Sequence, residues 1–320
     1  MSKTDQLKGY KRLNPLLKWV FSALSVYFYV RQIQGLEGNL LRDVSLHLSE
    51  NILLFVAIVL LALVNWNSEA QKFKLLIAGE VKLSNLRAFL TILGGMAISN
   101  FTPARTGEYI GRGLLLKKLH PLKVVIATVG GNIAQVLMTY SLGLSCIGIA
   151  VLFTDFGGDL GDTSKLVYVL ISSVVIVLFV LNIKRILPWV LQLLPRKIAK
   201  TLDLIKKYDS TLYSKVVLLA FIRYVAFTLQ FYLFLQLFSD FAMPMSALLF
   251  VPIAYLMQSL VPVPAVSDVG VRVAVSQLLF GAYLMDYAMV QAVTCLWFIN
   301  LILPGLLGTI YLLISIIRQR

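Results

Sequence analysis

The stretch that decides the fold class runs from Pro121 to Phe153 and reads PLKVVIATVGGNIAQVLMTYSLGLSCIGIAVLF. Its apolar residues are continuous, and Lys123 is its single charged side chain. A run of about 20 such residues is long enough to cross a bilayer as a helix, whereas strands of a membrane barrel alternate apolar and polar residues. The stretch therefore predicts a membrane-spanning helix.

Composition extends this prediction to the whole chain. Hydrophobic residues make up 59% of the 320 positions and charged residues 14%, and the mean hydropathy is +0.84. A soluble globular chain carries about a quarter charged residues, so this composition excludes a soluble enzyme, a disordered regulator and a disulfide-stapled secreted domain. We predict an all-α, polytopic integral membrane protein in which residues 1–320 form a single transmembrane domain.

Continuous apolar runs predict about six full spans, the first of them an uncleaved anchor. They lie at 19–30 with its flanks, 51–66, 121–153, 165–183, 216–238 and 287–317. Residues 35–50 and 67–87 mix polar and apolar side chains, and we expect both segments to run along the membrane surface.

Two further apolar runs, 84–101 and 246–261, are interrupted by proline-containing breaks. We interpret each as part of a re-entrant or broken helical hairpin, because a full crossing at 84–101 would place the basic residues that follow it outside, against the charge rule. The halves 15–153 and 165–317 then form an inverted repeat, a pattern typical of transporters with a midplane site. Ordinary proline-kinked helices around a structural core are the alternative.

The distribution of Lys and Arg predicts the orientation. Basic residues dominate the segment 184–215, which we predict to be a cytoplasmic loop, whereas the loop 154–165 is acidic and should lie outside. A multi-pass protein of the cell (inner) membrane with both termini in the cytoplasm follows. We ascribe the net charge of +14 to topology and to an anionic lipid surface on the cytoplasmic side, not to nucleic acid. The basic loop could also dock a partner protein.

Charged residues follow the first break directly. Thr102 is a candidate N-cap and Pro103 suits the first helical position, so a helix starting there would aim its positive end into the membrane. Arg105, Glu108 and Arg112 share one helix face, and Glu108 and Arg112 form a favourable i, i+4 pair. The alternative is a self-neutralising structural cluster. However, two arginines against one glutamate leave a positive charge, which favours an anionic ligand such as a lipid phosphate.

The second break offers Ser267 or Asp268 as a helix cap, followed by Arg272. Asp268 could bond to its own helix start or pair with Arg105 or Arg112 across the inverted repeat. The predicted substrate-binding set comprises Asn100, Thr102, Arg105, Glu108, Arg112, Asp268 and Arg272.

The remaining polar residues at membrane depth predict structure and not chemistry. We expect the buried amides to join helices, Arg223 to snorkel, and Gly107 and Gly111 to admit a closely packed helix. No catalytic residue, cofactor or metal centre is predicted, since the two Cys lie in apolar runs and the two His stand without spaced partners.

The first break carries a resemblance to a known family. Residues Asn100–Glu108 (NFTPARTGE), followed by Arg112, resemble the first signature of the lysylphosphatidylglycerol synthase transmembrane region, also called the flippase-like domain family. Residues Val269–Arg272 (VGVR) are similar to its second signature. The family has Gly-Gly at 267–268 and Glu at 273, and Asp268 is a candidate to replace that glutamate's charge.

The resemblance implies a function in moving lipid between leaflets. In full-length synthases a soluble C-terminal domain transfers an aminoacyl group to phosphatidylglycerol. This sequence ends at Arg320, just after its last predicted span, so we expect no such domain and no aminoacyl-lipid synthesis by this chain alone.

The leading hypothesis is therefore a flippase-like or lipid-binding transporter that handles a phospholipid or other lipid-phosphate headgroup at a midplane Arg/Glu site. The sequence favours this non-enzymatic function. The alternatives are a membrane-embedded transferase acting on a lipid-phosphate substrate, with Glu108 or Asp268 as base, and an accessory subunit.

Overall fold

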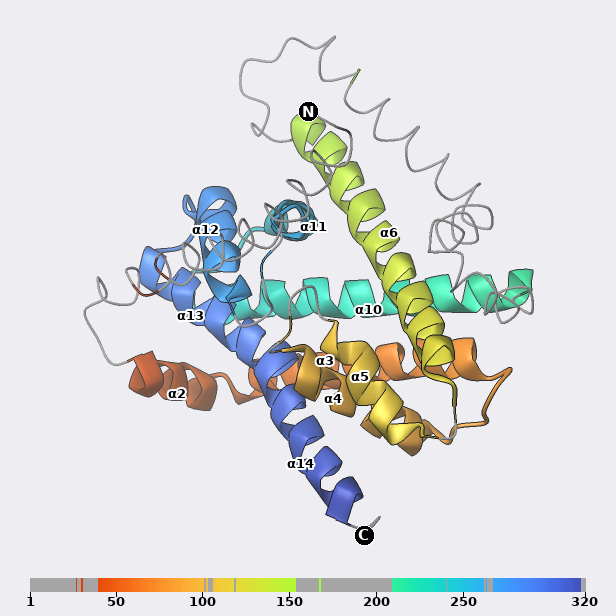
Figure 1. Ribbon diagram of the computed structural model, residues 1–320. Helices are drawn as coiled ribbons and strands as arrows, with labels where there is room; N and C mark the ends of the chain where they lie inside the picture. The colour runs from red at the N-terminus through yellow and green to blue at the C-terminus, as the bar shows by residue number, and fades with distance from the viewer. Residues whose placement is uncertain are drawn as a thin grey trace, which may run out of the picture.

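A computed structural model describes two long ranges, Leu40–Phe153 and Asp209–Ile317, from which residues 101, 103–105, 118, 240, 262 and 264–266 are excepted. It also describes the single residues 27, 30 and 167. Every regular element in these ranges is a helix, as Figure 1 shows. The helices are α2 (Leu40–Glu50), α3 (Ile52–Ile77), α4 (Asn85–Ser99), α5 (Gly107–Leu115), α6 (Pro121–Phe153), α10 (Ser210–Leu237), α11 (Ala247–Ser259), α12 (Asp268–Phe280), α13 (Asp286–Trp297), η3 (Phe298–Ile302) and α14 (Leu303–Ile317). The predicted all-α class is confirmed.

Four helical segments within the described ranges are long and apolar enough to cross a membrane. They are Ile52–Ile77, Pro121–Phe153, Thr211–Leu237 and Asp286–Ser315, the last formed by α13, η3 and α14 in succession. These segments agree with four of the six predicted spans, whereas the predicted spans 19–30 and 165–183 fall almost wholly outside the described residues. The chain is thus a multi-pass membrane protein.

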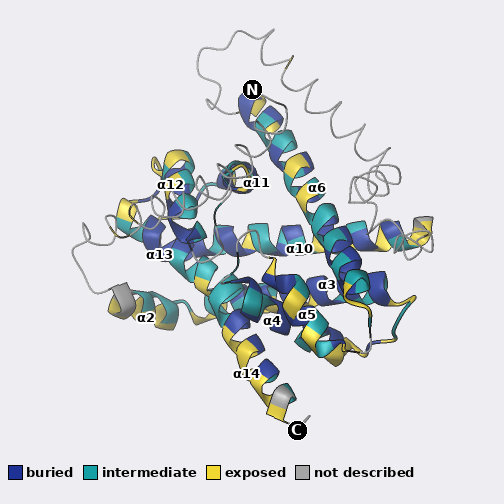
Figure 2. Cartoon of the chain, in the orientation of Figure 1, coloured by how far each residue is buried: buried dark blue, intermediate teal, exposed yellow. Residues whose placement is uncertain are grey.

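The outer faces of these segments are apolar. Leu53 on α3, Leu218 on α10 and Leu313 on α14 are all largely exposed. Figure 2 shows exposed residues on the outward faces of α6 and α14 and buried residues where the helices meet. Extended exposed apolar surface of this kind is suited to lipid tails and not to water.

Both predicted breaks separate two short helices. α4 ends before the first break and α5 follows it, and α11 and α12 flank the second. α4 and α11 are apolar but shorter than the spans, and each packs against the helix after its break. The breaks are therefore present where the sequence predicts them, and the inversion of the two halves stays a prediction.

One sequence prediction is wrong in part. Residues 67–77 do not leave the span to run along a surface, because α3 continues unbroken from Ile52 to Ile77. Three polar side chains of this segment, those of Ser68, Glu69 and Lys72, are buried among other helices. Burial is possible because the charges of Glu69 and Lys72 are neutralised by partners, described below.

Glycines set the spacing around α4. A Cβ atom on Gly111 would overlap the backbone of Gly94, and one on Gly308 would overlap the carbonyl group of Leu93. α5 and α14 therefore lie in backbone contact with α4, which confirms the close helix approach predicted at Gly111. This packing holds the side chains of α5 next to α3 and α6.

Candidate functional site

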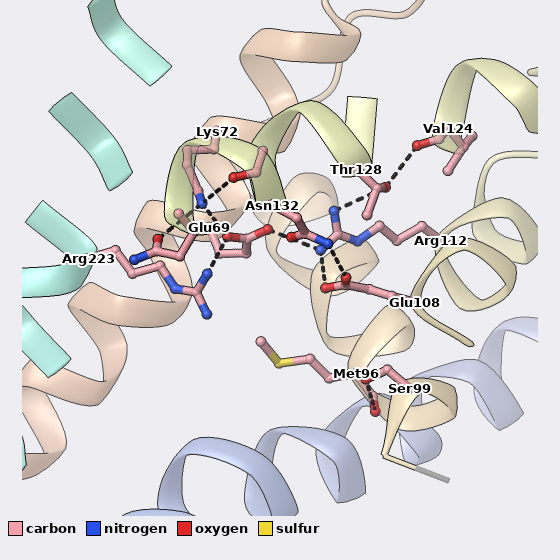
Figure 3. A network of polar contacts seen from close by, with 12 residues as sticks. Glu69, Lys72, Met96, Ser99, Glu108, Arg112, Val124, Thr128, Asn132 and Arg223 are labelled. Carbon is pink, nitrogen blue, oxygen red and sulfur yellow. Dashed lines mark hydrogen bonds and ion pairs between the residues drawn. The ribbon is translucent and has the colours of Figure 1, made fainter. Parts of the chain in front are cut away.

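Glu69 lies at the centre of a buried network of charges. Its carboxylate accepts from Lys72 Nζ at 2.8 Å on α3, from Arg112 Nη2 at 3.1 Å on α5 and from Arg223 Nη1 at 2.8 Å on α10. Figure 3 shows Arg112 from α5 and Arg223 from α10 converging on Glu69 and Lys72 of α3. A single carboxylate thus joins three helices.

Arg112 makes the most contacts in this network. Its Nη2 also donates to Glu108 Oε1 at 2.6 Å, and its Nη1 donates to Thr128 Oγ1 at 3.3 Å on α6. The guanidinium carbon lies 4.8 Å from the ring centroid of Phe73, within the range of a cation–π contact. The predicted Glu108–Arg112 pair is present, and it is buried.

The network carries an excess of positive charge. Three cations, Lys72, Arg112 and Arg223, contact two anions, Glu69 and Glu108. The net charge of these five side chains is therefore +1. Unbalanced charge away from water is unfavourable, so the network favours a nearby anion.

Amide side chains extend the network. Asn65 on α3 accepts from Arg223 Nε at 2.8 Å and donates to Asn300 Oδ1 at 2.7 Å. Asn300 in turn donates to Gln230 Oε1 at 2.7 Å, and Asn132 donates to Glu108 Oε2 at 3.1 Å. These contacts confirm that Asn132, Gln230 and Asn300 join helices.

A cavity of about 440 Å³ opens beside this network. Its walls come from both broken hairpins and from α3, α6, α10 and η3. Four of the predicted site residues line it, namely Asn100, Glu108, Asp268 and Arg272. The structure therefore brings polar residues that flank the two breaks to one cavity, of a size typical of small-ligand sites.

Two arginines line this cavity, and each has one terminal nitrogen without a partner among the described residues. Arg223 uses Nε and Nη1 on Asn65 and Glu69, and Arg272 uses Nε and Nη2 on Asp268 Oδ2, at 2.7 and 2.6 Å. No described residue bonds to Arg223 Nη2 or Arg272 Nη1. Guanidinium groups oriented in this way are suited to bind phosphate oxygens.

The other predicted site residues differ in position. Arg112 is buried behind Glu108 and does not line the cavity. Thr102 Oγ1 accepts from the backbone N–H of Gly107 at 2.7 Å, but the N-cap of α5 is Thr106 and not Thr102 as predicted. The sequence predicts that this helix begins at Pro103, but α5 begins at Gly107. Arg105 lies outside the described residues.

Two interpretations of single residues are corrected. Asp268 pairs with Arg272 one turn along α12, while Arg112 pairs with Glu69 and Glu108. Arg223 does not snorkel toward water, because Asn65 and Glu69 hold its guanidinium inside the protein.

The predicted basic loop 184–215 is also shorter than expected. Asp209 caps α10 by accepting from the backbone N–H of Leu212 at 2.7 Å, so Lys215 belongs to the helix. The rest of this segment lies outside the described residues. In the described part of the chain, no group of His, Cys, Asp or Glu side chains could hold a metal ion.

Sequence reasoning missed Glu69, Lys72 and Arg223 as members of one cluster. A local signal existed for two of them, since Glu69 and Lys72 stand at i, i+3 and the apolar sequence resumes at Leu75. A polar segment followed by more apolar helix is more consistent with a buried cluster than with a surface helix.

Comparison of the chain with known protein families finds a match. A family model described as "Lysylphosphatidylglycerol synthase TM region" matches residues 16–308, which include every described helix except the end of α14. No curated protein matches the chain.

Proposed function

The chain belongs to the lysylphosphatidylglycerol synthase TM region family, and we propose that it is a flippase-like or lipid-binding transporter that holds a lipid phosphate in the central cavity. A function related to membrane lipid, with a lipid as partner, follows from the family. The proposal adds the site and the process.

The observation that carries the proposal is the placement of Arg223 and Arg272 on the wall of one cavity beside a network with excess positive charge. A phosphate bound between their free nitrogens would accept charge-assisted hydrogen bonds from both. It would also neutralise the surplus charge of the network. A neutral ligand could accept hydrogen bonds from both arginines but would leave the surplus charge in place, and a cationic ligand would be repelled.

Each remaining site residue has a role in this proposal. Glu69 and Asp268 orient the two arginines, and Arg112 acts as a positioning residue because it touches Glu69 and Glu108 but not the cavity. Asn100 and Glu108 line the cavity as polar contacts for the headgroup. The other predicted ligands, Thr102 and Arg105, belong to the break that precedes α5.

The proposed process is alternating access. The headgroup would occupy the polar cavity while the acyl chains stay in the bilayer, and rocking of the two halves would open the cavity to each leaflet in turn. We place the protein in the cell membrane with both termini cytoplasmic, as the charge distribution predicts.

Leaflet transfer of fluorescent phosphatidylglycerol in reconstituted vesicles tests this function. We expect Arg272→Gln to lower the transfer rate at least tenfold. Arg87→Gln is the matched control, because Arg87 is exposed on α4 and does not line the cavity. Equal rates in Arg272→Gln and in the unmodified protein would contradict the proposal.

The transferase alternative has less support in the geometry. Both oxygens of Glu108 accept hydrogen bonds, from Arg112 and from Asn132, and Asp268 is paired with Arg272. A carboxylate held by cations is a weak general base. The accessory-subunit alternative rests on the basic segment 184–208, which lies outside the described residues.

A further inference from the structure

A second pocket, of about 510 Å³, lies apart from the central cavity and shares no lining residue with it. It is enclosed by α2, the end of α10 and the turn that joins α12 to α13. Figure 1 shows α2 and the start of α13 on the left of the molecule.

The position of this pocket is defined by the ends of candidate membrane spans. α10 ends at Leu237, α13 begins at Asp286, and α2 ends immediately before α3. Span ends lie where the hydrocarbon meets the headgroup layer. In the predicted orientation these three ends all belong to the outer side. The pocket therefore lies at the depth of lipid headgroups.

Aromatic rings dominate the walls of the second pocket. Phe238, Phe241, Tyr283 and Tyr287 line it, and His47 packs edge-on against Phe238 with ring centroids 5.4 Å apart. Aromatic faces attract cations through their ring quadrupole, and quaternary and primary ammonium groups are the usual ligands.

One carboxylate, that of Glu50, also lines this pocket. No Lys or Arg is among its described lining residues, and no described residue forms an ion pair with Glu50. The charge of the pocket is thus opposite to that of the central cavity. An anionic group would be repelled here, and a cation would be attracted by both the rings and the carboxylate.

A buried amide adds a second requirement. Gln291 on α13 lines the pocket and is 1% exposed, and its Nε2 has no hydrogen-bond partner among the described residues. A buried donor without an acceptor is unfavourable. A ligand that carries an oxygen a few bonds from its ammonium group would satisfy this donor.

We propose that the second pocket binds the alkylammonium headgroup of a zwitterionic phospholipid at the membrane boundary. The ammonium group would lie between the aromatic rings and Glu50, and a phosphate or ester oxygen would accept from Gln291 Nε2. The apolar side chains of Leu46, Phe241 and Met285 on the pocket wall are exposed and would contact the acyl chains.

Native mass spectrometry of the purified full chain with phosphatidylethanolamine or phosphatidylglycerol of equal acyl length tests this proposal. We expect the protein to retain phosphatidylethanolamine at this site and Glu50→Gln or Phe241→Ala to lower that retention about 5–10-fold. Asp286→Asn is the matched control, because Asp286 is exposed at the same end of the molecule but does not line the pocket. Unchanged retention in Glu50→Gln, or equal loss in Asp286→Asn, would overturn the proposal.

Two further experiments test whether the ammonium group belongs to a membrane lipid and whether Gln291 Nε2 donates to the ligand. Free ethanolamine should not displace the lipid at equal concentration, and displacement would overturn the assignment to a membrane lipid. Gln291→Leu should lower retention while the unfolding temperature stays equal or rises. A fall in both would overturn the role of Nε2. Glu50→Gln introduced into the Arg272→Gln variant should still lower phosphatidylethanolamine retention by the same factor, so failure of the central cavity and failure of this pocket give different results.

Discussion

Glu69 and Arg223 are 154 positions apart in the sequence, yet their side chains form an ion pair of 2.8 Å within the helical core. Glu69 belongs to the first predicted half of the chain and Arg223 to the second. The Asn65–Asn300 hydrogen bond of 2.7 Å joins the same two halves. Any movement of one half against the other must therefore either keep these contacts or exchange them for others.

The first prediction concerns the charge of Glu69. Glu69→Gln removes the anion that three cations share, and breaking a buried ion pair on one side typically costs about 3–5 kcal/mol. We expect a correspondingly lower free energy of unfolding in detergent. The double variant Glu69→Gln/Arg223→Gln should lose less than the sum of the two single variants, because their effects are coupled. Additive losses would contradict the shared network.

The second prediction tests the contact between α4 and α5. Gly111→Ala places a Cβ against the backbone of Gly94, where no flexible side chain can move aside, so we expect a loss of about 1–3 kcal/mol in stability. Gly113 on the same helix has open space around its Cβ position. Gly113→Ala should therefore leave stability equal or raise it by up to about 1 kcal/mol.

Thermal unfolding of these two glycine variants in one detergent gives the comparison directly. Similar unfolding temperatures would show that α5 does not lie in backbone contact with α4. Because α5 carries Glu108 and Arg112, the same displacement should also lower lipid transfer in Gly111→Ala.

Local signals in the sequence predict the spans and the two breaks. An uninterrupted apolar run such as 121–153 is most stable as a helix that crosses the membrane. A proline with a neighbouring polar residue ends a helix, because its steric and capping effects act within a few positions. The Glu108–Arg112 pair is local in the same sense. These features could therefore be predicted without the fold.

The rest of the site could not be predicted because its partners are distant in the chain. Glu69 meets Arg112 across 43 positions and Arg223 across 154, and no spacing rule connects them. Without those partners the charges of Glu69 and Lys72 predict a surface helix. The tertiary ion pairs of Glu69 with Arg112 and Arg223 are what allow this polar part of α3 to stay buried.

The third prediction concerns Asp268. Asp268→Asn keeps an oxygen that can accept from Arg272 but removes the negative charge paired with it, which raises the net charge of the cavity wall by one unit. We expect anionic phospholipid to bind about tenfold more tightly, which corresponds to about 1.4 kcal/mol, and to leave more slowly. Equilibrium binding of phosphatidylglycerol measures the first effect and leaflet transfer the second. Asp286→Asn, with the same charge change away from the cavity, should alter neither.

The last prediction separates charge from geometry at Arg223. Arg223→Lys keeps one positive charge near Glu69, but a single ammonium cannot bond to Asn65 and Glu69 as a fork and still present a free nitrogen to the cavity. We expect stability to fall by only about 0.5–1.5 kcal/mol, the usual value of one hydrogen bond, while leaflet transfer falls at least tenfold. Arg223→Gln should lose both, because Glu69 then lacks one counter-charge. Transfer at the unmodified rate in Arg223→Lys would show that charge alone suffices, and the phosphate-binding role of the guanidinium would have to be abandoned.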